Sequence, residues 1–321
     1  MTKTFYFFVV LFCISSGNLF AQEEADSTAT KRKHKYRHWR MRENRDTLDA
    51  RQQITKKAED VLVTVFNPNE PTLNNADSII QAFDDLPSFG IYKNNYIITG
   101  TTIGHEPSEY NSDAKFQISV SQRLTNSVLP FRTYLMLTYT QLAFWNIYQE
   151  SFPFGDINFN PTVGFGRALA YKNRFLGTLM FQFEHESNGK DGEDSRSWNK
   201  LSFGAMFKLN RFWTVQTKAW IPFVDGENNK DIVRYKGWGH MAVDYGNNNK
   251  YNAGLLLTKR GGGFFDNNIT LNFSYRLFKR ENQYLFLEYY NGYGENMLEY
   301  KRYRHMVRIG FVIQPNFFHL Y

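Results

Sequence analysis

From about residue 92 to the end of the chain, apolar and polar residues alternate over short segments. Phe116, Ile118 and Val120, for example, are separated by single polar residues. Because successive side chains of a strand point to opposite faces, this pattern predicts strands with one apolar and one polar face. The predicted strands fall near 93–104, 114–125, 130–145, 157–171, 173–187, 196–209, 211–223, 233–246, 250–261, 265–279, 282–293 and 302–314. Their number, about twelve, is even, as in a closed antiparallel barrel with both termini on one side.

Aromatic residues make up 17% of the chain, with 30 Phe and 20 Tyr. Outer-membrane barrels carry many aromatic side chains in girdles at the membrane interfaces, whereas a soluble β-sandwich rarely needs so many. We therefore expect an all-β fold: a twelve-stranded antiparallel transmembrane β-barrel with an N-terminal extension, located in the bacterial outer membrane. Beyond the N-terminal leader no stretch approaches about 18 uncharged apolar residues, so no transmembrane helix is expected.

Residues 1–21 have the organisation of a secretory signal peptide. Lys3 supplies the positive charge, residues 5–14 form a short apolar core, and Ala21 provides a small residue for cleavage. The only cysteine, Cys13, lies inside this leader. The exported chain is therefore expected to have no disulfide framework, although its compartment would permit one.

Residues 22–90 differ in composition from the expected barrel domain at 91–321. The run 31–45 is strongly basic, and helix-compatible segments follow at 48–65 and 77–83. Such a basic run suits binding to anionic lipid or another polyanion, or it forms a solvated tail that like-charge repulsion keeps open. Because the leader predicts export, no nucleic acid is expected as a partner.

One predicted hairpin places chemically useful side chains on a single face. If 181–187 is a strand, His185 and Ser187 share the face of Phe183, and on the returning strand Asn199 shares the face of Phe203. Apolar faces of paired strands lie on the same side of a sheet. His185, Ser187 and Asn199 are therefore expected to gather at the loop end of the hairpin as a base, a nucleophile and an orienting amide.

These three residue types suit acyl transfer. A serine hydroxyl is a poor nucleophile at neutral pH and needs an adjacent base, a role that histidine fills well. The second ring nitrogen needs a partner that fixes the tautomer. An asparagine would orient the ring without placing an unpaired carboxylate on a lipid-facing surface, where a charge is costly. A His-x-Ser pair alone also occurs by chance in loops.

The wider segment is more specific. His185-Glu-Ser187-Asn-Gly189, an acidic loop and then Ser195-Arg-Ser-Trp-Asn199 resembles the signature of the outer-membrane phospholipase A family. Other landmarks of that family are matched at 139–145, 151–154, 228–232 and 291–296, so the resemblance spans roughly residues 90 to 315. It implies a twelve-stranded barrel that hydrolyses acyl esters of phospholipids and lysophospholipids (A1 and A2 activity), requires Ca²⁺ and is active as a homodimer.

The resemblance also implies roles for individual residues. Ser187 would be the nucleophile, His185 the base, Asn199 its orienting partner and the backbone N–H of Gly189 the oxyanion donor. The implied calcium ligands are the Lys190 carbonyl, the Ser195 hydroxyl, Ser151 from the partner protomer and Asn228, and Gln141 matches the polar dimer-interface residue of the family.

The chain departs from the family pattern at some positions. Where the family has carboxylates for a second calcium site, this chain has Glu227 and Asn228. At the loop position where the family has an Asp, this chain has Gly192. The sequence therefore does not decide whether a second calcium site exists at Glu227 and Asn228. The resemblance also does not explain residues 22–90.

Two non-enzymatic alternatives are a porin and a structural or adhesive barrel. A porin requires a wide polar lumen, whereas about a dozen strands enclose a narrow interior that side chains largely fill. The presence of His185, Ser187 and Asn199 together argues against a barrel that has lost its chemistry.

Overall fold

The structure, a computed structural model, describes residues 75–172, 174–247, 250–278, 282–315 and 321. The predicted signal peptide, the basic run and the helix at 48–65 lie outside these residues. Within the described part of the chain, no helix combines the length and apolar character needed to cross a membrane.

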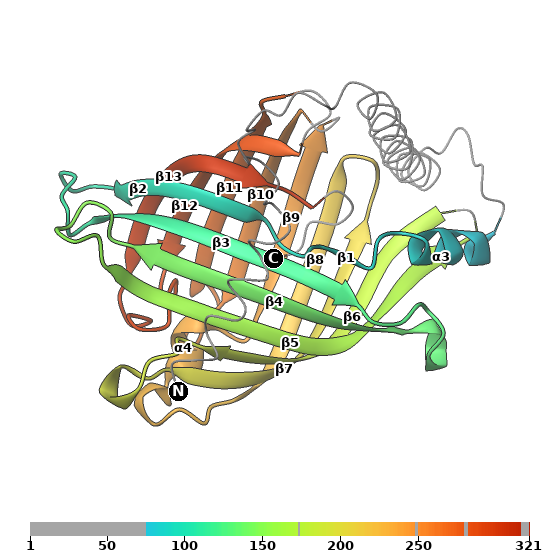
Figure 1. The fold of residues 1–321 in the computed structure, drawn as a ribbon, viewed down its shortest axis with the longest axis horizontal. Helices are drawn as coiled ribbons and strands as arrows, with labels where there is room; N and C mark the ends of the chain where they lie inside the picture. The colour runs from blue at the N-terminus through green and yellow to red at the C-terminus, as the bar shows by residue number, and fades with distance from the viewer. Residues whose placement is uncertain (1–74, 173, 248–249, 279–281, 316–320) are drawn as a thin grey trace, which may run out of the picture. The chain divides into compact units, whose positions relative to one another are not determined.

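The described residues form a closed antiparallel barrel (Figure 1). Its strands are β2 (Asn95–Thr102), β3 (Ser112–Arg123), β4 (Tyr134–Trp145), β5 (Phe154–Tyr171), β6 (Arg174–Ser187), β7 (Ser197–Lys208), β8 (Trp213–Phe223), β9 (Gly239–Asn247), β10 (Tyr251–Lys259), β11 (Asn267–Arg276), β12 (Gln283–Gly292) and β13 (Arg304–Ile313). Each strand pairs with its neighbours along the chain, and β13 closes the barrel by pairing with β2. The predicted twelve-stranded barrel is confirmed.

Two elements differ from the predicted pattern. A short strand, β1 (Phe89–Ile91), precedes β2, and both pair with the same edge of β3. Residues expected to begin the strand at 233–246 instead form helix α4 (Ile232–Lys236), and β9 starts only at Gly239. Ile232 and Val233 are both buried in an apolar cluster with Trp198, Met297 and Tyr300, so they serve the packing of this loop and not the barrel wall.

The two faces of the barrel wall carry opposite chemistry. On β6, Phe181 and Phe183 are 47% and 48% exposed, while Gln182 and Glu184, which alternate with them, are each only 2% exposed. The exposed face is the outer wall, where aromatic and aliphatic side chains meet lipid, and the buried face lines the interior. The alternation in the sequence therefore reflects lipid outside and a polar lumen inside.

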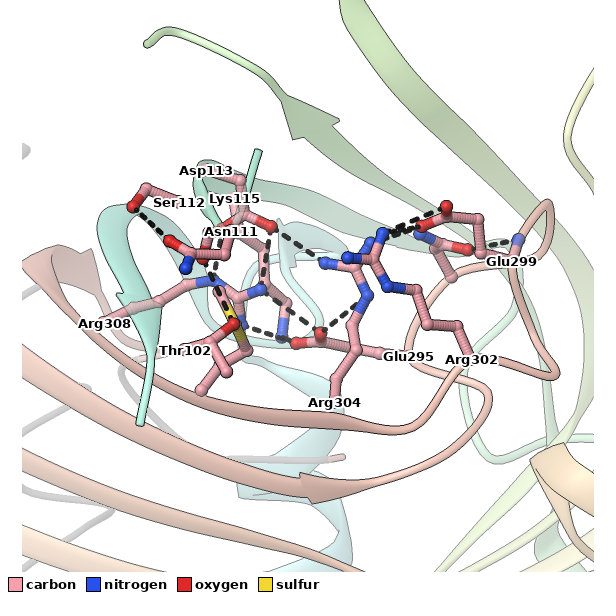
Figure 2. Close-up of polar contacts among 12 residues, drawn as sticks. Thr102, Asn111, Ser112, Asp113, Lys115, Glu295, Glu299, Arg302, Arg304 and Arg308 are labelled. Carbon is pink, nitrogen blue, oxygen red and sulfur yellow. Dashed lines mark hydrogen bonds and ion pairs between the residues drawn. The ribbon is translucent and has the colours of Figure 1, made fainter. Parts of the chain in front are cut away.

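Ion pairs occupy the interior (Figure 2). Arg308, whose side chain is fully buried, contacts Glu295 at 2.6 Å and Asp113 at 2.7 Å, and Lys115 contacts Glu288 at 2.8 Å and Glu295 at 3.1 Å. Removing one partner of such a buried pair typically costs about 3–5 kcal/mol, because the other charge is left uncompensated. Charged side chains packed across the lumen disfavour the porin alternative.

Helix α3 (Ala76–Asp84) packs at one end of the barrel, and it confirms the helix predicted at 77–83. The side chain of Asn75 caps its N-terminus by accepting from the Ser78 N–H at 2.8 Å. Its apolar face buries Ile79 and Phe83 in a cluster of lumen-facing side chains. Arg123 donates to the Phe83 and Asp84 carbonyls at 2.9 and 2.7 Å, which satisfies backbone groups that a helix end leaves unpaired.

Candidate active site

The predicted residues lie at the end of the β6–β7 hairpin away from α3. In the register of this hairpin His185 faces Asn199 directly, and Ser187 faces Ser197. His185 and Ser187 share the outer face of Phe183, because Glu184 points into the interior. Asn199 shares the outer face of Phe203, which is 55% exposed. All three side chains are half-buried on the lipid-facing wall.

His185 and Asn199 are in contact. His185 Nδ1 lies 2.9 Å from Asn199 Oδ1, a hydrogen bond that forms when Nδ1 carries the ring proton. The other ring nitrogen, Nε2, is then the unprotonated one and has a lone pair for proton transfer. The Asn160 amide also donates to the His185 carbonyl at 2.9 Å, which ties this part of β6 to β5.

Ser187 is two residues from His185 on the same face, at the last position of β6. Among the described residues, its side chain makes no hydrogen bond, so the hydrogen bond to His185 expected from the sequence is not formed here. Hydrogen bonds between a nucleophile and its base are often long in ligand-free enzymes and tighten with substrate.

The turn after Ser187 depends on glycine. Gly189 has φ +66°, and an added Cβ would lie 2.9 Å from the ring of Phe159. Residues other than glycine rarely adopt this left-handed backbone conformation. No hydrogen bond within the described chain engages the Gly189 N–H. A backbone donor next to the serine is thus available to a ligand.

Asn188 holds the two ends of the loop 188–196 together. Its backbone N–H donates to the Arg196 carbonyl at 3.1 Å, and its side-chain oxygen accepts from the Arg196 N–H at 2.9 Å. Its amide nitrogen donates to the Asp194 carbonyl at 2.9 Å. This buried side chain therefore fixes the loop that follows the nucleophile position.

A buried carboxylate supports Asn188 from the barrel interior. Asp156, 1% exposed, accepts from the Met297 and Leu298 N–H groups at 3.0 and 2.9 Å and lies 3.5 Å from the Asn188 amide nitrogen. It thereby links the β5 wall, the loop before β13 and the turn at Ser187. Sequence reasoning missed this role, because Asp156 is 32 positions from Asn188 and 141 positions from Met297, and strand periodicity does not indicate either contact.

The loop between β8 and β9 packs over the same end of the barrel. Ile232 and Val233 join Trp198, Met297 and Tyr300 in one apolar cluster. Partial burial acts to raise the pKa of Asp231, but hydrogen bonds from Lys301, at 2.8 Å, and from Tyr300, at 2.5 Å, outweigh it and lower that pKa.

Asp225 lies at the start of this loop and accepts from the Asn199 amide at 3.1 Å. Like Asp156, it is a residue that the sequence analysis did not single out.

The residues predicted to bind calcium lie in exposed loops. Lys190 and Ser195 share the loop 188–196, and the Asn228 amide donates to the Gly192 carbonyl of that loop at 2.8 Å. Within the described residues, neither the Ser195 hydroxyl nor the Lys190 carbonyl is engaged in a hydrogen bond. Carbonyl and hydroxyl oxygens are ligands that Ca²⁺ accepts, so this donor set fits the ion. No cluster of three or more His, Cys, Asp or Glu suited to a metal occurs in the described chain.

The residues implied in dimerisation lie on neighbouring parts of the barrel. Ser151 occupies the β4–β5 loop with φ +62°, an uncommon conformation for a serine. Gln141 lies on β4, and its side-chain oxygen accepts from the Tyr139 hydroxyl at 3.0 Å.

A closed antiparallel barrel with an apolar outer wall and an ion-paired interior defines an integral protein of the bacterial outer membrane. The family model described as phospholipase A1 matches residues 82–313. The chain belongs to the phospholipase A1 family. The resemblance noted from the sequence is thereby confirmed.

Individual relatives agree with this assignment. Phospholipase A1 of Escherichia coli (strain K12) is 28% identical over 214 residues, which cover 64% of this chain and 71% of that protein. The solved outer membrane phospholipase A from Escherichia coli matches with a TM-score of 0.63 and 26% identity, over 72% of this chain and 100% of that chain. The Salmonella typhi outer membrane phospholipase dimer with bound calcium matches with a TM-score of 0.62 and 25% identity, over 70% and 91%.

Proposed function

We propose that this protein is a calcium-dependent outer-membrane phospholipase A that hydrolyses acyl esters of glycerophospholipids and lysophospholipids and is active as a homodimer. The observation that carries the proposal is the 2.9 Å contact between His185 and Asn199 beside Ser187, on the outer face of the barrel wall, where Phe183 and Phe203 are also exposed. Membership of the phospholipase A1 family supports the same activity.

In this proposal Ser187 Oγ attacks the acyl carbonyl carbon while His185 Nε2 takes the hydroxyl proton. The Gly189 N–H donates to the developing oxyanion. When the carbon–oxygen ester bond breaks, His185 returns the proton to the departing glycerol oxygen, and the acyl group stays on Ser187. Water, deprotonated by the same nitrogen, then attacks the acyl carbon, and His185 returns that proton to Ser187 Oγ as the fatty acid leaves. Asn199 holds the imidazole in the tautomer that permits both transfers.

Calcium enters the proposal through the Lys190 carbonyl and the Ser195 hydroxyl, with Ser151 supplied by the partner protomer. When bound there, Ca²⁺ would supply positive charge near the developing oxyanion. The calcium-bound dimer of the Salmonella typhi relative supports this part of the proposal.

Dimerisation provides a control that an enzyme embedded in its own substrate needs. Because one ligand, Ser151, would come from the second protomer, the calcium site is complete only in the dimer. Gln141 would place a polar side chain in the interface between two lipid-facing walls. Activity would then depend on association within the bilayer, and isolated protomers would leave the membrane intact.

The test is phospholipid hydrolysis by the full chain in detergent, with Ca²⁺ and with a chelator, beside the Ser187→Ala variant. We expect hydrolysis only with Ca²⁺ and only with Ser187 present, and covalent labelling of Ser187 by a sulfonyl fluoride. Hydrolysis by Ser187→Ala at the wild-type rate would refute the assigned nucleophile. No hydrolysis by the folded wild-type dimer with Ca²⁺ would favour the structural-barrel alternative.

A further inference from the structure

Asp225 makes contact with the candidate catalytic group from outside the β6–β7 hairpin. It lies two residues beyond the end of β8, which pairs with β7, and Phe223 at that end is the register partner of Asn199. Its Oδ2 accepts from Asn199 Nδ2 at 3.1 Å, and its Oδ1 accepts from Ser197 Oγ at 3.3 Å. Each carboxylate oxygen therefore has its own donor on β7.

The chemistry of Asp225 decides which way the Asn199 amide points. An ionised carboxylate accepts hydrogen bonds and cannot donate them, so it must face the amide NH₂ group. The amide oxygen of Asn199 is then directed to the opposite side, where it meets His185 Nδ1 at 2.9 Å. That oxygen accepts a hydrogen bond from Nδ1–H, and the neutral ring then leaves Nε2 unprotonated. The ring tautomer needed in a base thus follows from the position of Asp225.

Close packing holds Asp225 in this position. Asn229, which is fully buried, donates to the Ser197 carbonyl at 2.8 Å and accepts from the Ser197 N–H at 3.2 Å. A Cβ added to Gly226 would lie 2.0 Å from Asn229 Oδ1 and 2.8 Å from the Ser197 carbonyl oxygen. Only glycine fits at position 226, between Asp225 and the Asn229–Ser197 hydrogen bonds. These bonds hold the loop against β7 directly beside the carboxylate of Asp225.

We propose that Asp225 is a positioning residue of the hydrolytic site, acting through Asn199 on His185. It locks the asparagine amide in one of its two orientations, and its negative charge polarises the amide toward the imidazolium that forms during acyl transfer. In this series of hydrogen bonds, the imidazole of His185 contacts the uncharged Asn199 amide, and the carboxylate of Asp225 lies behind that amide in the exposed loop. This inference rests on the proposed hydrolase activity.

The first test compares Asp225→Ala and Asp225→Asn with the wild type in calcium-saturated phospholipid hydrolysis. Asp225→Ala releases the amide of Asn199, and we expect kcat to fall about tenfold with KM within about twofold. Asp225→Asn keeps an oxygen that accepts from Asn199, and we expect kcat within about threefold of the wild type. Labelling of Ser187 by a sulfonyl fluoride should slow in parallel with kcat. Equal kcat values for Asp225→Ala and the wild type would overturn the proposal.

A double-mutant cycle separates action through Asn199 from a general effect of the loop. If Asp225 acts only through that amide, Asp225→Ala should change kcat by less than about twofold in the Asn199→Ala background. Additive losses would contradict the proposal. Restoration of Asp225→Ala activity by raised Ca²⁺ would also overturn it, because Asp225 would then be serving the ion.

The matched control is Glu106→Ala, which removes an exposed carboxylate from the β2–β3 loop at the same end of the barrel. Its kcat should equal that of the wild type. Failure of the inference and failure of the proposed function are distinguishable. If Ser187→Ala is inactive while Asp225→Ala is fully active, only the role of Asp225 is refuted; if Ser187→Ala hydrolyses lipid normally, the proposed function itself fails.

Discussion

The indole nitrogen of Trp198 donates to Glu186 Oε2 at 3.0 Å on the inner wall of the barrel. These two residues are register partners, and the adjacent register pair is His185 and Asn199 on the outer wall. Glu186 also contacts Lys200 at 3.0 Å and Lys236 at 2.8 Å. The candidate site therefore lies on a segment of sheet whose inner face is stabilised by hydrogen bonds and ion pairs to Glu186.

The first prediction concerns this bracing. Trp198→Phe removes the indole donor but keeps most of the apolar volume, so we expect the free energy of unfolding to fall by about 1.5–3 kcal/mol, the usual contribution of a hydrogen bond to a charged group. Unfolding of the detergent-solubilised barrel, followed by far-UV circular dichroism, measures it. Trp238→Phe, at a side chain that is 50% exposed, is the control and should change stability by less than about 0.5 kcal/mol. Equal stability of both variants would contradict a stabilising Trp198–Glu186 contact.

The second prediction exchanges the groups at positions 199 and 225. Asn199→Asp places a second carboxylate beside Asp225, and like charges at hydrogen-bonding distance resist joint ionisation. We expect kcat to fall about tenfold in the single variant and to recover to within about threefold of the wild type in Asn199→Asp/Asp225→Asn. Steady-state hydrolysis at saturating Ca²⁺ measures both. A double variant no better than Asn199→Asp would count against direct coupling of the two positions.

The third prediction concerns the turn that offers the backbone donor. Gly189→Ala combines a left-handed backbone cost of about 1–2 kcal/mol with a clash against Phe159, so the N–H should be displaced and kcat should fall at least about tenfold. Gly104→Ala is the matched control, because Gly104 also has positive φ, +87°, but has no atom within 4 Å of an added Cβ. Its kcat should not change. Full activity of Gly189→Ala would exclude this N–H as the oxyanion donor.

The fourth prediction concerns the shared calcium site. Ser151→Ala should raise the Ca²⁺ concentration for half-maximal activity about tenfold, or ~1.4 kcal/mol, and lower turnover, while the barrel stays folded. Calcium titration of hydrolysis, with circular dichroism as the folding check, measures it. Ser108→Ala, in another exposed loop, should titrate like the wild type. An unchanged calcium response of Ser151→Ala would remove Ser151 from the ligand set.

Much of the fold was predictable because lipid and lumen impose opposite demands on alternate residues. Phe181 and Phe203 must both face lipid, which excludes a register shift by one residue, and in the structure they pair directly and bring His185 opposite Asn199. The same reasoning failed at the start of the strand predicted at 233–246, where Val233 packs in a loop cluster and not in the barrel wall. Strand periodicity carries no information about packing within a long loop.

The contacts behind the site were not predictable for a related reason. Asp225 is 26 residues from Asn199 in the chain, and its place depends on the close fit of Gly226 against Asn229. Asp156 reaches Asn188 from the neighbouring strand β5. A carboxylate in a polar stretch gives no signal of its partner, so only the three-dimensional structure reveals these supports. The roles of His185, Ser187, Asn199 and the proposed calcium ligands stay predictions until the variants are measured.

The outward direction of His185 and Ser187 has a consequence for kinetics. A substrate that reaches this wall must travel sideways within the plane of the membrane, and not from the aqueous phase. Turnover should therefore follow the mole fraction of phospholipid in a mixed micelle, and dilution of the lipid with inert detergent should slow the reaction even when the bulk concentration of lipid is held constant.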